Sequence, residues 1–327
     1  MDFRLSDEQR AIADLAGELF AGDGANPPTW ETLFDAGLPS LLVAEAQGGV
    51  GLGQVELAQV LIAQGRGLVS MPLWRHALAA QALSLSGKAP RDGDRLSLAL
   101  DSVVTVRDAP EGLVLDGEIR AVVGAGEASC LVLPAGAGEA ARLYVIALDH
   151  AGVTAAEGVL TDGERASDLK LRGVPAVALD VDMEWLGVRA AACLAALAVG
   201  VARGAIERTA DYVGTRYQFG RAIGSFQAVG QRMADAFSDV EVAHTLLFEL
   251  AWRIDADAEI GSTAEIATYW ANQCSHRVSH AAMHLHGGIG ADTSYPIHRV
   301  LLMSRALEMM LGGPHRQLAR IGERLAA

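Results

Sequence analysis

The sequence predicts a mainly α-helical protein of the α+β class, with helices at both ends and β-strands between them. Apolar residues recur at helical spacing in residues 1–92 and, in longer runs, in residues 182–327. Residues 93–181 instead contain short β-rich runs separated by turn residues, at a spacing of roughly ten residues. We therefore expect an N-terminal helical domain (1–92), a small middle β-barrel or sandwich (93–181) and a C-terminal four-helix bundle (182–327).

The N-terminal domain carries clear helix-start and turn signals. Ser6 and Gln9 have the spacing of a capping box, so the first helix is expected to begin there. Further helices are expected over Trp30–Ala36, Gln54–Arg66 and Trp74–Leu85. The glycine-rich segment Gln47–Gly53 has no convincing strand before it, which favours a structural turn over a nucleotide-binding loop.

The middle domain is predicted from its alternation of apolar runs and turns. The expected strands are Leu96–Leu100, Val103–Val106, Leu113–Leu115, Ala121–Val123, Cys130–Leu133, Leu143–Leu148, Val153-Thr154 and Ala176–Leu179. Asp116-Gly117 and the Gly/Ala stretch Ala135–Ala141 are read as turns between them. This pattern predicts antiparallel strands in a barrel or sandwich.

The C-terminal domain is predicted to consist of long helices. They are expected over roughly 183–216, 224–256, 261–287 and 296–311, with a last helix from 314. The most apolar run, Leu186–Ala202, is interrupted by Arg189 and continues into a charged amphipathic segment. It is therefore interpreted as a buried bundle helix, and no membrane-spanning helix is expected.

Composition excludes several classes of function. The net charge of −14 over 327 residues argues against nonspecific nucleic-acid binding, which needs a cationic surface. The residues from Met1 to Glu8 lack the basic and apolar regions of a signal peptide. Three widely spaced cysteines indicate neither a disulfide framework nor a metal site, and they fit a cytoplasmic location.

Two segments of the C-terminal domain contain residues suited to binding a phosphorylated cofactor. Arg216 ends a long helix, and its guanidinium can bind a pyrophosphate through two hydrogen bonds, with Gln218 as a further donor. Phe219, Ile223 and Phe226 offer apolar contact to a planar or sugar group. Gly287 and Gly288 stand at a helix end, where the absent side chains allow a ligand to approach the backbone.

The order of elements and these motifs together resemble the acyl-CoA dehydrogenase family over nearly the whole chain. The likeness begins at Leu5–Gln9 and continues at Gly48–Gly51. In the C-terminal half it rests on Gly200, Ala205, Tyr212, Arg216, Gln218, Phe219, Gly220, Ile223, Phe226, Gln227, Gly287, Gly288, Gly290, Tyr295, Pro296, His298 and Arg299.

The resemblance implies a flavin site shared between subunits. In the family these segments receive the ADP half of the FAD that a neighbouring subunit holds. The residues implied to bind FAD in this way, called the cradle below, are Arg216, Gln218, Phe219, Ile223, Phe226, Gln227, His284, Gly287 and Gly288. His284 departs from the family, which usually has Gln there, but histidine can also donate a hydrogen bond.

Two segments of the middle domain depart further from the family. The strands that line the flavin ring and the thioester in the family are replaced by Leu98–Ser102 and Arg120–Val123. Their loss predicts that the flavin pocket in this subunit's own β-domain is poor or empty.

The catalytic carboxylate of the family is missing from its two known positions. Flavin-dependent dehydrogenation removes a proton from Cα of the acyl-CoA, which requires a base. The resemblance places Leu311 and Ala190 at the positions of that glutamate, and neither can accept a proton. Glu308 lies one helical turn before Leu311 and is the candidate substitute.

Several histidines have a spacing found in metal sites. His276, His280 and His284 are spaced four residues apart, which would suit a metal pair on a helix. No carboxylate partner is evident in the sequence, and the FAD interpretation already accounts for His284. No metal site is therefore predicted.

The combination narrows the resemblance to the smaller subunit of actinobacterial α2β2 heterotetrameric acyl-CoA dehydrogenases, which act on steroid side-chain CoA thioesters, as in cholesterol breakdown. It implies a longer, glutamate-bearing homologue as partner, an acyl-CoA substrate and an electron-transfer flavoprotein as electron acceptor. Alternatives are a self-sufficient homotetrameric dehydrogenase using Glu308, a flavin-free scaffold subunit, and a flavin monooxygenase of the same fold, which usually lacks the Arg216–Gly220 motif.

Overall fold

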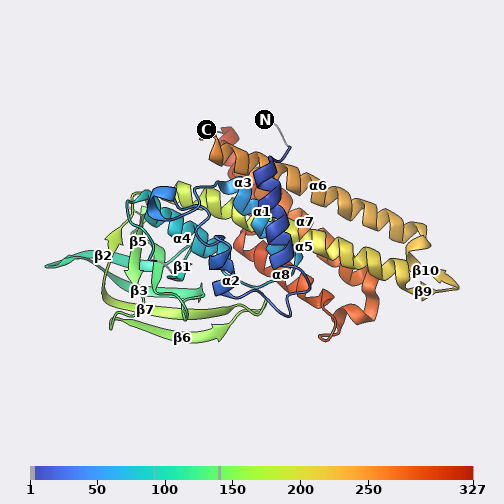
Figure 1. Ribbon diagram of the computed structural model, residues 1–327, viewed down its shortest axis with the longest axis horizontal. Helices are drawn as coiled ribbons and strands as arrows, with labels where there is room; N and C mark the ends of the chain where they lie inside the picture. Colours follow the sequence, from blue (N-terminus) through green and yellow to red (C-terminus); the bar gives the residue numbers. More distant parts are fainter. Residues whose placement is uncertain (1–3, 92, 139–140, 327) are drawn as a thin grey trace. The chain divides into compact units, whose positions relative to one another are not determined.

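The computed structural model describes residues 4–91, 93–138 and 141–326, which form two compact units. The first unit comprises Met1–Pro28, Gln54–Ser70 and Ala191–Ala327, and the second Thr29–Gly53 and Met71–Ala190 (Figure 1). Residue 92, the end of the predicted N-terminal domain, lies outside the described residues, as do the first three residues of the predicted non-signal N-terminus.

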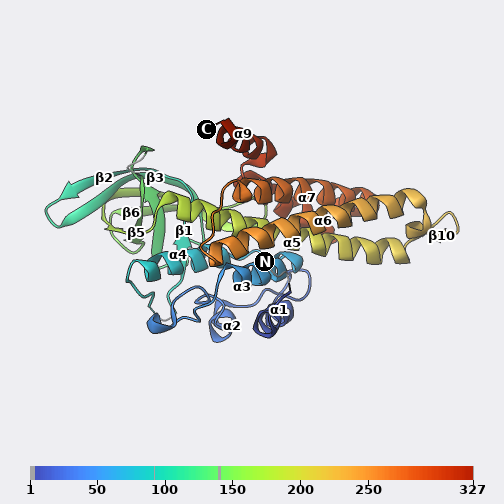
Figure 2. The same cartoon turned by 90° about the horizontal axis from the view of Figure 1, so that it is seen from above.

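The first unit is helical, as the sequence predicts for its C-terminal part. Its helices are α1 (Asp7–Leu19), α3 (Gln54–Arg66), most of α5 (Met183–Thr215), α6 (Gln227–Asp255), α7 (Thr263–His286), α8 (Ile297–Met310) and α9 (Gly313–Ala326). Within this unit, α1 and α3 lie on one side of the layer of α5, α6 and α7, and α9 lies on the other (Figure 2). The predicted capping box is confirmed, because Ser6 and Gln9 exchange hydrogen bonds of 3.0 and 3.1 Å.

Helix α5 forms the core of this unit. It is long and apolar enough to cross a membrane, but most of that apolar stretch is buried inside the protein, which confirms the predicted bundle helix. Gly200 allows α5 to cross α3 closely, since a Cβ there would lie 2.2 Å from the Ile62 carbonyl oxygen. Gly65 serves the same contact from α3, where a Cβ would lie 2.4 Å from the Leu197 carbonyl oxygen. The crossing therefore requires glycine on both helices.

Arg299, one of the family-typical residues, fastens two loops of the first unit. Its guanidinium donates to the carbonyl oxygens of Asp23 at 2.6 Å and Leu68 at 2.8 Å. Arg208 adds a bond to the carbonyl oxygen of Gly22 at 2.5 Å. These arginines satisfy backbone carbonyls that the loops leave unpaired, so their role is structural.

The second unit combines α2 (Trp30–Asp35), η1 (Glu45–Gln47), α4 (Leu73–Leu85), the start of α5 and two four-stranded sheets. One sheet has the order β1 (Leu96–Leu98), β4 (Cys130–Ala135), β5 (Arg142–Ala147), β8 (Val177–Ala178). The other has the order β2 (Val103–Ala109), β3 (Gly112–Val123), β7 (Arg165–Pro175), β6 (Val153–Val159). Side chains from both sheets share one apolar core, so the sandwich describes the unit better than the barrel.

One pair of strands departs from the predicted antiparallel arrangement. β1 and β4 are parallel, whereas all the other neighbours in the two sheets are antiparallel. β2 and β3 lie between β1 and β4 in the chain and belong to the other sheet. The long excursion that this requires permits a parallel pair, which a tight hairpin does not.

The predicted turn at Asp116-Gly117 is wrong. β3 runs through both residues, with an irregularity in its register against β7 between Leu115 and Gly117. Gly117 has φ of 149°, and a Cβ there would lie 2.3 Å from the Val103 carbonyl oxygen. The bulge at this point lies on β7, where Arg172 and Gly173 stand opposite Asp116, so the Asp-Gly pair is part of a continuous strand. Part of the other predicted turn, residues 139–140, lies outside the described residues.

Candidate functional site

The first cradle segment forms a hairpin where α5 ends and α6 begins (Figure 1). Strands β9 (Tyr217–Gln218) and β10 (Arg221–Ala222) pair across a two-residue turn made by Phe219 and Gly220. Both turn residues have positive φ, 54° and 79°. This is the signature of a type I′ hairpin turn, in which glycine and asparagine are favoured and phenylalanine is unusual.

Phe219 is both strained and exposed. An L-residue in this left-handed conformation costs roughly 1–2 kcal/mol, and 91% of the Phe219 surface remains exposed. The Phe219 ring contacts the Phe226 ring edge-on, with the ring centroids 6.2 Å apart. The Arg221 guanidinium stacks on the Phe226 ring, 3.9 Å from its centroid. The fold thus holds an aromatic ring at the hairpin tip without burying it.

The polar cradle residues of the hairpin point to solvent. Arg216 is exposed, and among the described residues no side chain or carbonyl pairs with its guanidinium. Gln218 is also exposed; one of its amide hydrogens is bonded to the Tyr217 carbonyl oxygen at 2.8 Å, which leaves the second available. Ile223 and Phe226 are half-buried beneath them, and Gln227 is exposed at the start of α6.

The second cradle segment lies at the end of α7. Gly287 has φ of 63°, and Gly288 follows it in η4 (Gly287–Ala291). A Cβ on either glycine would meet no atom of the described chain within 4 Å. Positive φ accounts for Gly287, but nothing inside the chain accounts for Gly288. The open space beside both glycines fits the approach of an external group.

Aromatic stacking brings the two segments together. Tyr212, one helical turn before Arg216, stacks on His286 with ring centroids 4.4 Å apart. The Tyr212 hydroxyl also donates to the His286 carbonyl oxygen at 3.4 Å. His286 donates from Nδ1 to the Ala282 carbonyl oxygen at 2.8 Å, and burial holds its pKa below the ordinary value. The end of α5 is thereby fixed to the end of α7.

His284 has a partner that the sequence analysis missed. Arg232, on the second turn of α6, donates from Nη1 to Nδ1 of His284. The two residues are 52 positions apart, so no local pattern could have linked them. Arg232 also lines a groove of about 550 Å³ between α6 and α7, together with His276 and His280.

These residues fit one half of a dinucleotide. An exposed guanidinium, an amide and an imidazole provide donors for a diphosphate, and the aromatic tip and the bare glycines provide contact for a planar group. The observation that supports the fit is the open space at Gly288, where a Cβ would meet no atom of the described residues within 4 Å. The arrangement can bind and orient such a group, but the cradle contains no carboxylate to serve as the base.

The positions of the family's base are apolar and buried. Leu311 is the C-terminal cap of α8, with 5% of its surface exposed, and Ala190 on α5 is 4% exposed. Neither can transfer a proton.

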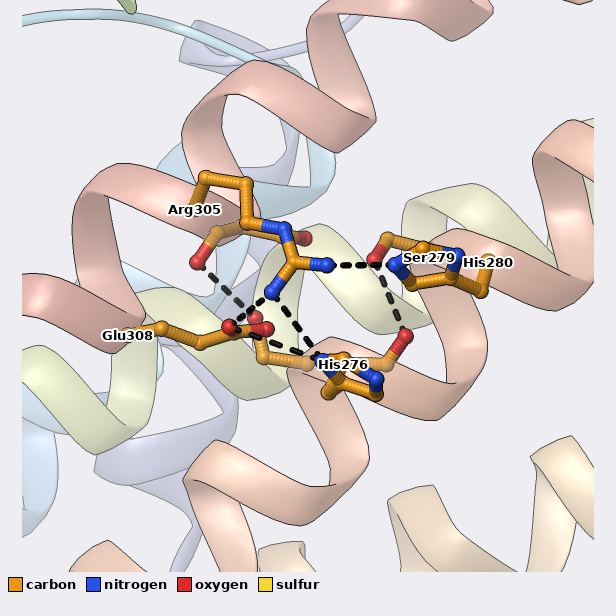
Figure 3. Close-up of polar contacts among 7 residues, drawn as sticks. His276, Ser279, His280, Arg305 and Glu308 are labelled. Atoms are coloured by element: carbon orange, nitrogen blue, oxygen red, sulfur yellow. Dashed lines mark hydrogen bonds and ion pairs between the residues drawn. The ribbon is translucent and has the colours of Figure 1, made fainter. Parts of the chain in front are cut away.

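The candidate substitute Glu308 is engaged within the chain. Its Oε2 accepts a hydrogen bond from Arg305 at 2.5 Å and lies 3.7 Å from Nδ1 of His276 (Figure 3). The Glu308 side chain is only 14% exposed. The carboxylate is therefore held by an arginine on its own helix, α8, and a histidine on α7.

The histidine spacing on α7 does not assemble a metal site. Within residues 4–91, 93–138 and 141–326, no group of three or more His, Cys, Asp or Glu side chains is placed to hold a metal ion. His276 and His280 instead lie against Arg305, at 3.0 and 2.5 Å (Figure 3).

The two divergent segments of the β-domain are used for structure. The Leu98 carbonyl oxygen accepts a hydrogen bond from buried Arg75 at 2.7 Å. Arg120 forms ion pairs with Asp168 at 3.0 Å and Glu118 at 3.2 Å on the exposed face of β3 and β7. These contacts are consistent with the predicted poor flavin pocket, which stays a prediction.

Comparison with known proteins places these features in a family. Residues 180–326 match the family described as the C-terminal domain of acyl-CoA dehydrogenase. Acyl-CoA dehydrogenase FadE27 of Mycobacterium tuberculosis is 36% identical, over 91% of this chain and 87% of the relative.

Two solved structures are similar over their whole length. The ChsE4-ChsE5 complex from Mycobacterium tuberculosis has a chain with a TM-score of 0.90 and 31% identity, covering 100% of this chain and 99% of that one. A variant of the Tcur3481-Tcur3483 steroid ACAD gives the same TM-score and identity, with 98% of each chain covered. These matches confirm the predicted fold of N-terminal helices, middle β-sheets and a C-terminal helical domain.

Proposed function

Because this chain belongs to the acyl-CoA dehydrogenase family, we propose that it is the non-catalytic, cofactor-binding subunit of a heteromeric FAD-dependent acyl-CoA dehydrogenase. It contributes the ADP-binding half of a flavin site, and a longer homologue contributes the catalytic half. One contrast supports the proposal: the cradle is exposed and partly strained at Phe219, whereas both positions of the family's base are buried and apolar.

The residues of this chain act on binding and orientation. FAD, when bound, supplies the acceptor for the hydride that leaves Cβ of the acyl-CoA. Arg216 binds the diphosphate through two parallel N–H donors, and Gln218 and His284 add single donors. Phe219 and Phe226 cover apolar parts of the cofactor, and Gly287 and Gly288 let the cofactor approach the backbone.

The proton at Cα is removed by the partner subunit. General-base catalysis requires a carboxylate whose lone pair faces that proton. Leu311 and Ala190 have none, and Glu308 accepts from Arg305 instead. Each active site therefore needs one glutamate from the partner and one cradle from this chain, which gives an α2β2 assembly with one flavin per partner subunit.

The relatives support a proposal for the substrate class. One similar structure is a steroid ACAD, and another is a complex of two named chains. We extend both features to this chain: a bulky acyl-CoA, such as a steroid side-chain thioester, bound in a pocket between unlike subunits. An electron-transfer flavoprotein re-oxidises the flavin, and the assembly works in the cytoplasm.

Substitution of Arg216 tests the proposal. In the complex co-expressed with the longer homologue, Arg216→Ala removes a charge-assisted contact and should weaken flavin retention roughly 10- to 100-fold. Arg277→Gln is the matched control, because Arg277 is an exposed arginine of the same unit that pairs with Asp239 at 3.1 Å. Flavin content and subunit composition are measured by absorbance and size-exclusion chromatography.

Each outcome separates the alternatives. Loss of flavin only in Arg216→Ala supports the shared site. Unchanged flavin in both variants would indicate a scaffold subunit that binds no cofactor. A yellow and active preparation of this chain alone would instead indicate a self-sufficient dehydrogenase.

A further inference from the structure

The histidines on one face of α7 all pair with arginines. His276, His280 and His284 each receive a hydrogen bond from an arginine on a neighbouring helix. Arg305 on α8 donates to Nδ1 of His276 and Nε2 of His280 (Figure 3), and Arg232 on α6 donates to Nδ1 of His284. A guanidinium carries donors only, so each contacted nitrogen must present a lone pair.

This contact fixes the chemical form of His284. Because Nδ1 accepts from Arg232, the ring is neutral and its hydrogen is on Nε2. The contact also fixes the orientation of the ring, since flipping it would remove the acceptor from Arg232. A mobile imidazole would present either a donor or a lone pair, and a lone pair repels the oxygens of a phosphate.

We propose that Arg232 is a positioning residue of the cradle: it holds His284 as an oriented Nε2–H donor for the diphosphate of the flavin. The inference rests on the proposed function. It explains how a histidine, whose ring can present either a donor or a lone pair, offers a fixed N–H donor at this position.

Arg305 makes the same kind of arginine–histidine contact away from the cradle. Its guanidinium is shared among His276, His280 and Glu308, so its partners all lie within the chain. Burial, with the nearby His276 and Arg305, lowers the pKa of His280, which keeps that ring neutral as well. Arg232 instead contacts one histidine on the last turn of α7, three residues before Gly287.

A double-mutant cycle tests the inference in the co-expressed complex. Arg232→Gln should weaken flavin retention roughly 10-fold when His284 is present. In a His284→Gln background the same substitution should change retention by less than about 2-fold, because the amide needs no orienting arginine. Arg232→Lys, which keeps a cationic donor, should retain flavin within about 3-fold of the unmodified chain.

Coupling to His284 is the deciding result. A loss that is equally large in both backgrounds would overturn the inference, because Arg232 would then act on the cofactor directly. If Arg232→Gln retains flavin while Arg216→Ala loses it, the positioning role is wrong and the proposed function stands. If neither substitution affects flavin, the proposed function itself fails.

A spectroscopic measurement on the full-length chain supplies a second readout that needs no cofactor. In a ¹⁵N-histidine-labelled chain, His284 should show Nε2 protonated and Nδ1 as acceptor. Arg232→Gln should give an averaged signal from exchanging forms, and Arg277→Gln should leave the signal unchanged. A proton on Nδ1 of His284 in the unmodified chain would contradict the proposal even if the Arg232→Gln complex does not assemble.

Discussion

The hairpin end of the helical unit and the Glu308 cluster both contain polar side chains, but these side chains differ in whether their hydrogen-bond partners lie within the chain. Arg305 donates to both Glu308 and His276, so these groups find partners within the chain, although Oε1 of Glu308 has none among the described residues. At the hairpin, Arg216 and Phe219 are exposed, and the described residues offer no partner to the Arg216 guanidinium. A polar side chain with partners inside the chain indicates a structural role, whereas an exposed one without such a partner is available to a ligand.

Two glycines provide the largest expected contrast between internal and external roles. A Cβ on Gly200 would lie 2.2 Å from the Ile62 carbonyl oxygen, whereas a Cβ on Gly288 would have no atom of the described residues within 4 Å. Gly200→Ala should therefore destabilise the chain by about 2–3 kcal/mol through overpacking. Gly288→Ala should change the free energy of unfolding by no more than about 0.5 kcal/mol, but it should reduce flavin retention. Urea unfolding and flavin content check both, and a stability loss in Gly288→Ala would contradict the external role.

Acid sensitivity should arise from buried histidines rather than from the cradle. Burial, and then Arg203, lowers the pKa of His244 in the helical unit to about 4. Its unfolded form takes up a proton below pH 6.5, which the folded form resists, so stability is lost as the pH falls from about 6.5 towards 4. By pH 5 this loss amounts to about 2 kcal/mol.

The β-containing unit should respond less to acid, because two groups act in opposite directions. Burial lowers the pKa of His76 to about 4, which removes stability as the pH falls. Burial, then Asp162, raises the pKa of Glu164 to about 7, so its contribution is present at low pH and is lost as the pH rises towards 7. In unfolding followed at pH 7.5 and 5, His244→Leu should flatten the decline and Glu164→Gln should steepen it. A decline unchanged by either substitution would contradict this assignment.

Glu308→Gln tests whether Glu308 has a structural rather than a catalytic role. The substitution removes the ion pair between Glu308 and Arg305, and it also removes the carboxylate that lies near His276. Together these losses should lower the free energy of unfolding by about 1–2 kcal/mol. Dehydrogenase activity of the complex, assayed with an artificial electron acceptor, should stay within about 2-fold of the unmodified enzyme, because Glu308 is not the base. A loss of activity of about 100-fold or more would make Glu308 the base instead.

Phe219→Asn should give the smallest effect and the most direct view of the strain in the hairpin. Asparagine tolerates the left-handed conformation, so the substitution should stabilise the chain by about 1 kcal/mol. Flavin retention in the complex should nevertheless fall, because the exposed ring is lost. A variant that is more stable and also retains flavin fully would show that Phe219 has no role in binding.

Local signals predicted most of the helices. The capping box at Ser6 and the long apolar run in α5 act within one element, so the sequence alone reveals them. The predicted turn at Asp116-Gly117 is wrong, because an Asp-Gly pair is typical of turns, whereas the close approach of Val103 that requires this glycine is apparent only in the sheet. β7 (Arg165–Pro175) was missed, since charged residues recur along it and its core face is apparent only against β3 and β6.

The site shows the same limit. Arg216 and the two glycines could be proposed from the sequence, because each proposed role depends on one side chain or one backbone position. The contact between Arg232 and His284 depends on how α6 packs on α7, so it required the structure. The same packing explains why the spacing of His276 and His280, which suits a metal pair, serves Arg305 instead.

The most direct test of the central claim is flavin content and subunit stoichiometry after co-expression with the longer, glutamate-bearing homologue, compared with this chain alone. The shared-site account predicts a yellow α2β2 complex with one flavin per partner subunit and a colourless preparation of this chain by itself. One flavin bound to every copy of this chain, without the partner, would contradict it.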